Sequence, residues 1–146
     1  MVWEFLSDVL LGGLLELLVS AGRPAEKTPL IKFLEVAHWK RRVVLVLAPS
    51  KQEPGFWEQR QLLAAASASL RERDALVLYR LHSELVASEK TYLHQHYGLQ
   101  LKGFEAVIIG KDGELKLRST HPLTPAALFA TIDQMPMRQQ EIRRRR

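Results

Sequence analysis

The chain has 146 residues, 47% of them hydrophobic and 25% charged, a balance that excludes a disordered chain and fits one globular domain. It contains no cysteine, which excludes disulfide bonds, thiol catalysis and thiolate metal sites. The formal net charge is +5, but the run Arg143 to Arg146 carries +4 of it and leaves +1 for residues 1–142. A basic pI that originates in a terminus gives little support for a nucleic-acid-binding face, so we expect no specific nucleic-acid partner.

Residues 1–22 are the most apolar part of the sequence, and two interpretations of them stay open. Glu4, Asp8 and Glu16 recur at multiples of four, which predicts an amphipathic helix over residues 2–20 that docks on a protein or lies on a membrane surface. The alternative is a degenerate export signal, because small residues at 20–22 follow an apolar stretch of suitable length. The acidic residues count against a signal and against a spanning helix. We expect an exported or periplasmic protein if the segment is a signal, and a cytoplasmic one otherwise.

Residues 23–29 are expected to be a linker, residues 30–137 the domain, and residues 138–146 a basic C-terminal tail. Three apolar runs predict buried strands, and two stretches of helical spacing predict helices between them. The strands are Arg42–Ala48, Ala75–Leu81 and 104–109, and the helices are 56–73 and 83–97.

The last third of the chain begins with a turn signal at Gly110-Lys111-Asp112-Gly113, followed by strict alternation over 114–118, which predicts a hairpin with an edge strand. Thr124-Pro125 predicts the start of a final helix over 126–132, ended by Met135-Pro136. The order β-α-β-α-β-β-α is typical of an α/β thioredoxin-like fold, with a mixed four-stranded sheet and helices on both faces. Because helices connect the first three strands, we expect these to be parallel.

Thioredoxins carry a Cys-x-x-Cys pair directly after the first core strand and a proline before the third strand. Here residues 48–55 contain no cysteine and residues 102–104 contain no proline, so both parts of a redox site are missing. Ser50 has no activating base near it in the sequence. We therefore expect no oxidoreductase activity and no cofactor.

Several stretches resemble the family called domain of unknown function 4174, across about residues 36–143. They are Trp39-Lys40-Arg41-Arg42 with the following VVLVLAPS, Leu70-Arg71-Glu72-Arg73-Asp74, the segment 110–119, and Leu128-Phe129 together with 132–139, which contains Met135-Pro136-Met137-Arg138. The last of these is the most specific. The resemblance implies a thioredoxin-like fold without established activity or catalytic residues. Members occur in short bacterial proteins, many exported, and in vertebrate sushi-repeat and matrix-associated proteins, which suggests adhesion or matrix binding by analogy.

Two groups of residues are candidates for binding an anion or an acidic partner. The first comprises Lys111, Lys116 and Arg118 on the predicted hairpin, joined by Arg138, where two arginines could grip a carboxylate or phosphate. The competing interpretation is a solvated edge strand with an internal pair, Arg118 to Asp133. The second group is the loop that starts at Ser50, with Lys51 and Arg60 beside the start of a helix.

Other features support weaker hypotheses. His94 and His96 invite a metal site, but residues two apart on a helix point to different faces, so we predict no metal. Trp39, Phe56 and Trp57 are a candidate aromatic binding patch. We expect a binding module for a protein or small anion. The alternatives are an enzyme working at the Ser50 loop and a weak binder of polyanions or membrane surfaces through Arg143 to Arg146. The sequence does not decide the oligomeric state.

Overall fold

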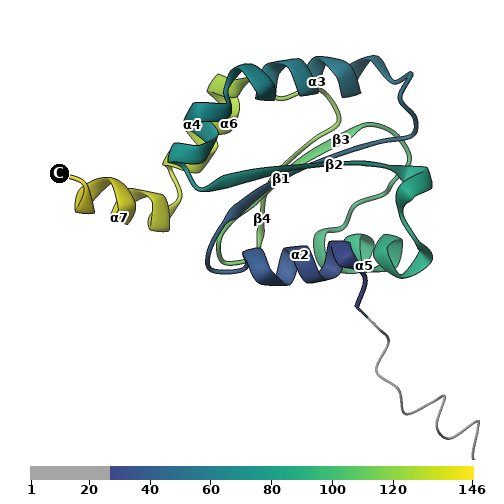
Figure 1. Cartoon of the computed structure of the whole chain (residues 1–146), viewed down its shortest axis with the longest axis horizontal. Helices are drawn as coiled ribbons and strands as arrows, with labels where there is room; N and C mark the ends of the chain where they lie inside the picture. Colours follow the sequence, from purple (N-terminus) through teal and green to yellow (C-terminus); the bar gives the residue numbers. More distant parts are fainter. Residues whose placement is uncertain (1–26) are drawn as a thin grey trace, which may run out of the picture.

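The computed structural model describes residues 27–146, so the predictions for residues 1–22 lie outside the described part of the chain. At its centre is a four-stranded sheet with the order β2-β1-β3-β4 (Figure 1). Its strands are β1 (Arg42–Ala48), β2 (Ala75–Leu81), β3 (Glu105–Ile109) and β4 (Leu115–Ser119). Every residue of β1 and β3 is buried, because neighbouring strands flank them and helices cover both faces. This explains why both strands are continuous apolar runs in the sequence.

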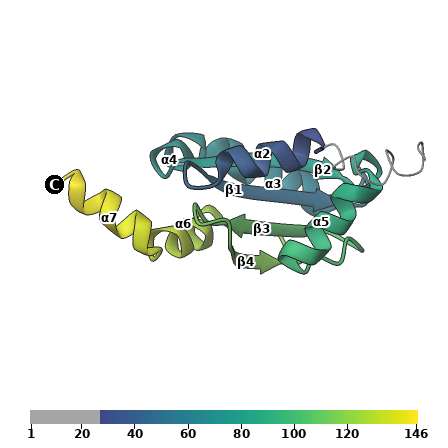
Figure 2. The ribbon, with the colours of Figure 1, turned by 90° about the horizontal axis from the view of Figure 1, so that it is seen from below.

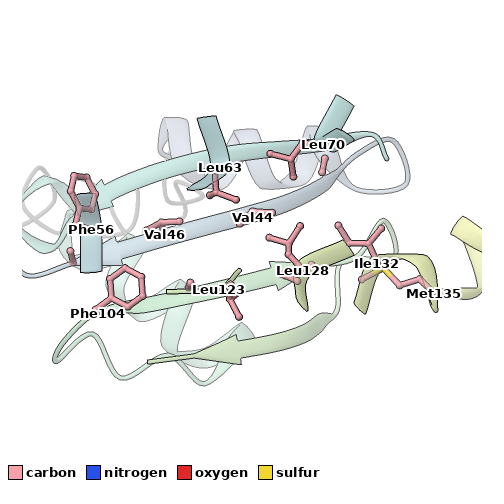
Figure 3. Close-up of a cluster of buried hydrophobic side chains, with 14 residues drawn as sticks. Val44, Val46, Phe56, Leu63, Leu70, Phe104, Leu123, Leu128, Ile132 and Met135 are labelled. Carbon is pink, nitrogen blue, oxygen red and sulfur yellow. The ribbon is translucent and has the colours of Figure 1, made fainter. Parts of the chain in front are cut away.

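Helices cover the sheet in two layers (Figure 1). On one side lie α3 (Pro54–Ala65), α4 (Ser67–Glu72) and α6 (Pro125–Asp133), and on the other lie α2 (Pro29–Ala37) and α5 (Ala87–Tyr97). The first layer packs on Val44 and Val46 of β1 through Leu63, Leu128 and other apolar side chains (Figure 3). The second packs on Val43 and Leu45 through Leu34 and Leu93. A short 3-10 turn, η1 (His82–Glu84), follows β2, and α7 (Pro136–Arg144) projects from one end of the molecule (Figure 2).

The strand directions confirm the thioredoxin-like fold and correct one detail. Strand β1 is parallel to β2, with Val44 opposite Val77, and β4 is antiparallel to β3. Strand β3, however, is antiparallel to β1, with Leu45 opposite Val107, so the expectation of three parallel strands was wrong. Helix α5 and the segment 98–104 together return the chain to the end of the sheet where β2 finishes. Gly98 supports this reversal with a φ of 67°.

Several helix boundaries differ from the predicted ones for local reasons. The helix predicted over 56–73 is divided at Ala66, where φ is −102° and ψ is 15°, and the one predicted over 83–97 starts at Ala87. Helix α2 was not predicted, although Thr28-Pro29 carries a start signal: the Thr28 hydroxyl accepts a hydrogen bond from the Ile31 amide (3.3 Å). The segment 138–144, expected in a tail, belongs to α7. Within residues 27–146, no helix combines the length and apolar character that crossing a membrane requires.

Candidate binding surface where strand β1 ends

Apolar packing occupies the place where thioredoxins carry their reactive cysteines. Strand β1 ends at Ala48, as the sequence predicted, and α3 begins at Pro54. Gly55, in the first turn of α3, lies so close to Phe104 that a Cβ atom there would be 3.3 Å from the ring carbon Cδ2. The next residue, Phe56, is 4% exposed and belongs to the core. The first turn of α3 is therefore packed against apolar rings rather than opened toward a reactive group.

An exposed arginine stacked among aromatic rings lies beside this closed end. The guanidinium carbon of Arg60 is 4.8 Å from the centre of the Tyr79 ring and 5.5 Å from that of Trp57. It is also 5.6 Å from the Phe56 ring, so residues of α3 and β2 together hold one cation over aromatic faces. Burial raises the pKa of the Tyr79 hydroxyl, against the opposing effect of the Arg60 charge. Tyr79 therefore stays neutral beneath the arginine.

Trp57 and Lys51 extend the same surface. The side chain of Trp57 is half exposed, and its indole Nε1 donates a hydrogen bond to the Lys51 carbonyl oxygen (2.6 Å). This bond fixes the loop after β1 against the first turn of α3. Ser50 and Lys51 are both exposed, as is Arg60. The structure thus brings Ser50, Lys51 and Arg60 to one surface, which we call the Lys51–Arg60 surface and which also includes Trp57.

The cations of the Lys51–Arg60 surface have no acidic partner in the described part of the chain. No carboxylate of residues 27–146 lies within 4.0 Å of the Lys51 ammonium or the Arg60 guanidinium. Glu53 and Glu58 are near in sequence but make no such pair. The positive charge of this surface is therefore exposed to solvent and is not neutralised by an acid of the described residues.

Lys111 and Arg138 lie at the opposite end of the sheet, in a partly buried network that we call the ion-pair cluster. Its members are Arg42, Glu72, Arg73, Asp74, Lys111, Asp133, Arg138 and Glu141. Arg42, with no exposed surface, donates from both terminal nitrogens to the two carboxylate oxygens of Glu141 (3.2 and 3.1 Å). Lys111 donates to the same carboxylate (2.6 Å) and to that of Asp74 (2.9 Å).

Arg138 is 3% exposed and fixes α7 to the domain. Its Nε donates to Asp133 Oδ1 (3.1 Å), and its Nη2 lies 3.3 Å from Glu72 Oε1. Hydrogen bonds from Arg73 hold the pKa of the Asp133 carboxyl below its ordinary value of 3.8, against the opposing effect of burial. Burial favours the neutral form of Glu141, but hydrogen bonds from Arg42 and Lys111 outweigh it and lower its pKa. These cations neutralise neighbouring acids and support the helix.

Lys116 and Arg118 are also paired within the fold. Lys116 donates to Asp112 Oδ2 (2.6 Å), and this hydrogen bond raises the pKa of the lysine. Arg118 donates through Nε to Glu105 Oε2 (2.8 Å), a carboxylate whose side chain is 3% exposed. The predicted pair of Arg118 with Asp133 was therefore wrong, since Asp133 binds Arg73 and Arg138 instead. Arg118 and Arg138 do not combine into one anion-binding fork.

The aromatic and histidine candidates are likewise separated. Trp39 precedes β1 whereas Trp57 follows it, and Phe56 is buried, so the three do not make one exposed patch. His94 donates to the Leu99 carbonyl (3.0 Å) and His96 to that of Tyr92 (3.1 Å), so the two imidazoles bond to different carbonyls. Residues 27–146 contain no cluster of three or more histidine, aspartate or glutamate side chains suited to a metal ion.

Two features of the structure were missed at the level of sequence. The bidentate contact of Arg42 with Glu141 joins residues 99 positions apart, and no local pattern announces it. The only available signal was a charged residue at the start of an otherwise apolar strand. Trp39 adopts a left-handed backbone conformation with a φ of 67°, which is rare for a bulky residue and has no signature in composition.

Comparison with known proteins places the chain in a family. The family model described as Domain of unknown function (DUF4174) matches residues 33–141, and the chain belongs to this family. A solved structure described as "Crystal structure of Trgpx in apo form" is 18% identical in sequence with a TM-score of 0.46, and the match covers 68% of this chain and 85% of that chain. The family description assigns no activity.

Proposed function

We propose that this thioredoxin-like domain is a non-redox binding module that recognises an acidic segment of a protein partner at the Lys51–Arg60 surface. One observation carries the proposal. Of the six cations predicted to bind an anion, four are paired with acids inside the fold, and only Lys51 and Arg60 keep their charge available. Both are exposed beside the half-exposed ring of Trp57.

The geometry suits a carboxylate ligand for two physical reasons. A guanidinium that stacks on aromatic rings keeps its edge free for paired hydrogen bonds to a carboxylate. The rings also restrict the rotamers of Arg60, so less conformational entropy is lost when a ligand binds. Tryptophan and arginine are the residues most often responsible for affinity at protein interfaces, and here they are neighbours.

The test uses the full chain with Trp3→Phe and Trp39→Phe, so that Trp57 alone reports by fluorescence. We expect a short synthetic peptide of alternating glutamate and glycine to change this fluorescence in a saturable manner. The double variant Lys51→Gln, Arg60→Gln should weaken binding about tenfold or more, because each lost charge-assisted contact removes affinity. The matched control Arg71→Gln, Lys90→Gln removes the same charge from exposed positions on α4 and α5 and should bind like the parent.

Measuring the free energy of unfolding of each variant distinguishes a loss of peptide binding from a loss of folding. The control variant should unfold within about 0.5 kcal/mol of the parent, because surface substitutions away from internal contacts rarely cost more. The Lys51→Gln, Arg60→Gln variant also loses the stacking of Arg60 on the aromatic rings, so we expect it to lose about 1 kcal/mol and to stay folded under the conditions of the binding assay. Equal peptide affinity in the two double variants would overturn the proposal, because it would show that binding follows net charge rather than this surface.

A further inference from the structure

The outer edge of strand β2 adjoins the Lys51–Arg60 surface and has no neighbouring strand within residues 27–146. Strand β2 stands at one end of the order β2-β1-β3-β4, so only one of its two edges is paired in this part of the chain. Every residue of β2 after Ala75 is at least partly exposed, with Leu76 at 36%, whereas all residues of β1 and β3 are buried. The β2 edge is therefore in partial contact with solvent along the strand.

The two edges of the sheet differ in the features that normally prevent the addition of a strand. Strand β4, at the other edge, has five residues, carries Lys116 and Arg118, and pairs with β3 through an irregular register between Ile108 and Ile109. Short length, positive charge and irregular pairing all hinder a further strand. Strand β2 has seven residues in regular register with β1, and Arg80 is its only charged residue. The β2 edge thus keeps the form of a strand that can accept another.

A hydrogen bond from β1 shows which backbone groups of β2 face outward. The Arg42 amide donates to the Asp74 carbonyl oxygen (2.8 Å), and the two strands stay in one parallel register to their ends. Successive residues of a strand direct their N–H and C=O groups to opposite edges, so the groups of Val77, Tyr79 and Leu81 point away from β1. These donors and acceptors are the ones that a partner strand would bond.

Arg80 covers one of these outward-facing groups. Its Nη1 donates a hydrogen bond to the carbonyl oxygen of the neighbouring Tyr79 (2.8 Å), which agrees with the outward direction of that carbonyl. Arg80 is itself only partly buried. The amide of an added strand can replace its guanidinium, and the Tyr79 carbonyl then keeps a hydrogen-bond donor.

The side chains of the outward-facing residues lie on the same face of the sheet as Arg60. Val77, Tyr79 and Leu81 pack against the core beneath α3, α4 and α6, and the Arg60 guanidinium carbon is 4.8 Å from the centre of the Tyr79 ring. A residue opposite Tyr79 on an added antiparallel strand would have its Cβ atom about 5 Å from that of Tyr79, on this same face. An acidic side chain there would reach Arg60, which has no carboxylate of residues 27–146 within 4.0 Å.

We infer that the acidic partner segment binds as an added antiparallel strand on the outer edge of β2, along residues 77–81, with a carboxylate at every second residue facing Arg60 and α3. This inference rests on the proposed function and specifies its partner as an extended segment rather than a helix. In strand addition, main-chain hydrogen bonds supply affinity and side chains at alternate positions supply specificity. An antiparallel strand is expected because that pairing is slightly more stable per residue than a parallel one.

N-methylated forms of the glutamate–glycine peptide test the added strand on the unchanged full chain. In an antiparallel strand whose carboxylates face α3, the glutamate amides face β2 and the glycine amides face solvent. Methylating the glutamate amides should weaken binding about tenfold or more, whereas methylating the glycine amides should leave the affinity within about twofold of that of the parent peptide. Both methylated peptides carry the same charges and the same number of methyl groups, so each is the control for the other.

Residue-level hydrogen exchange of the full chain locates the contact. The bound parent peptide should slow exchange of the Val77, Tyr79 and Leu81 amides about tenfold or more, because these amides gain acceptors. The amides of Leu78 and Arg80 already face β1 and should change much less.

The outcomes distinguish this inference from the proposed function. The added strand is overturned, with the proposed function intact, if the parent peptide needs the Lys51–Arg60 surface but the two methylated peptides bind equally. It is also overturned if the glycine-methylated peptide is the weaker one, or if exchange of the outward-facing amides is not slowed. Absence of saturable binding of the parent peptide would overturn both.

Discussion

Positive charge is buried and paired with acids at one end of the sheet and exposed to solvent at the other. Where β1 begins, Arg42, Lys111 and Arg138 are buried and bonded to Glu141, Asp133 and their neighbours. Where β1 ends, Lys51 and Arg60 are exposed, and Arg60 stacks on aromatic rings with no carboxylate of residues 27–146 within 4.0 Å of it. A buried cation must be paired because an isolated charge is too costly to desolvate, whereas an exposed one is free to meet a ligand. Availability therefore distinguishes candidate binding cations better than their number does.

The largest effect should come from removing the shared acid of the ion-pair cluster. Glu141→Ala leaves Arg42 and Lys111 with a buried charge and one partner fewer, and we expect a loss of about 3–5 kcal/mol in the free energy of unfolding. Urea denaturation measures this loss. The matched control is Glu114→Ala, a residue whose side chain is 76% exposed and which lies 3.4 Å from Lys116, and it should stay within about 0.5 kcal/mol of the parent. Similar losses in the two variants would show that the cluster does not bear on stability.

The second largest effect should come from lowering the pH, which should destabilise mainly the ion-pair cluster at the end of the sheet where β1 begins. The folded-state pKa values of Asp133 and Glu141 lie below the ordinary values of 3.8 and 4.5, so the folded protein binds fewer protons than the unfolded chain in this range. Their stabilising contribution is complete above the ordinary values and is lost as the pH falls through the lower folded-state values. Urea midpoints measured between about pH 6 and about pH 3 should therefore fall steeply at the acidic end.

The Glu141→Ala variant provides the comparison for this pH dependence. It lacks one of the three carboxyls whose folded-state pKa lies below the ordinary value, which are Asp112, Asp133 and Glu141, so its midpoint should fall less over the same interval. A parent and a variant with the same slope would contradict the assignment of acid sensitivity to the cluster.

A smaller difference in stability is expected between alanine substitutions at two glycines, one at each end of the sheet. Gly113, in the turn between β3 and β4, has a φ of 80°, and a Cβ atom there would lie 3.2 Å from His38 Cδ2. Gly113→Ala should cost about 1–2 kcal/mol because of the left-handed backbone. Gly103, which precedes β3 at the other end, would place no atom within 4 Å of its Cβ, so Gly103→Ala should be nearly neutral in thermal unfolding. Equal costs would show that the left-handed backbone of Gly113 does not limit substitution.

The element order could be predicted from the sequence because each central element is locally consistent. The run Arg42–Ala48 is apolar on both faces, and the Gly110–Gly113 turn and the Thr124-Pro125 cap each have a local signature. The direction of β3 could not be predicted, because it depends on where α5 and the following segment return the chain. For the same reason the ion-pair partners of Arg118 and Arg138 could not be predicted from the sequence. Pairings between residues distant in sequence are set by tertiary packing, not by spacing.

Mapping the bound glutamate peptide on the isotopically labelled full chain tests the central claim most directly. If availability decides which cations bind, amide and side-chain shifts should be centred on the loop after β1 and the first turns of α3, around Lys51, Trp57 and Arg60. Shifts centred instead on the hairpin of Lys111, Lys116 and Arg118, or on Arg143 to Arg146, would contradict the account.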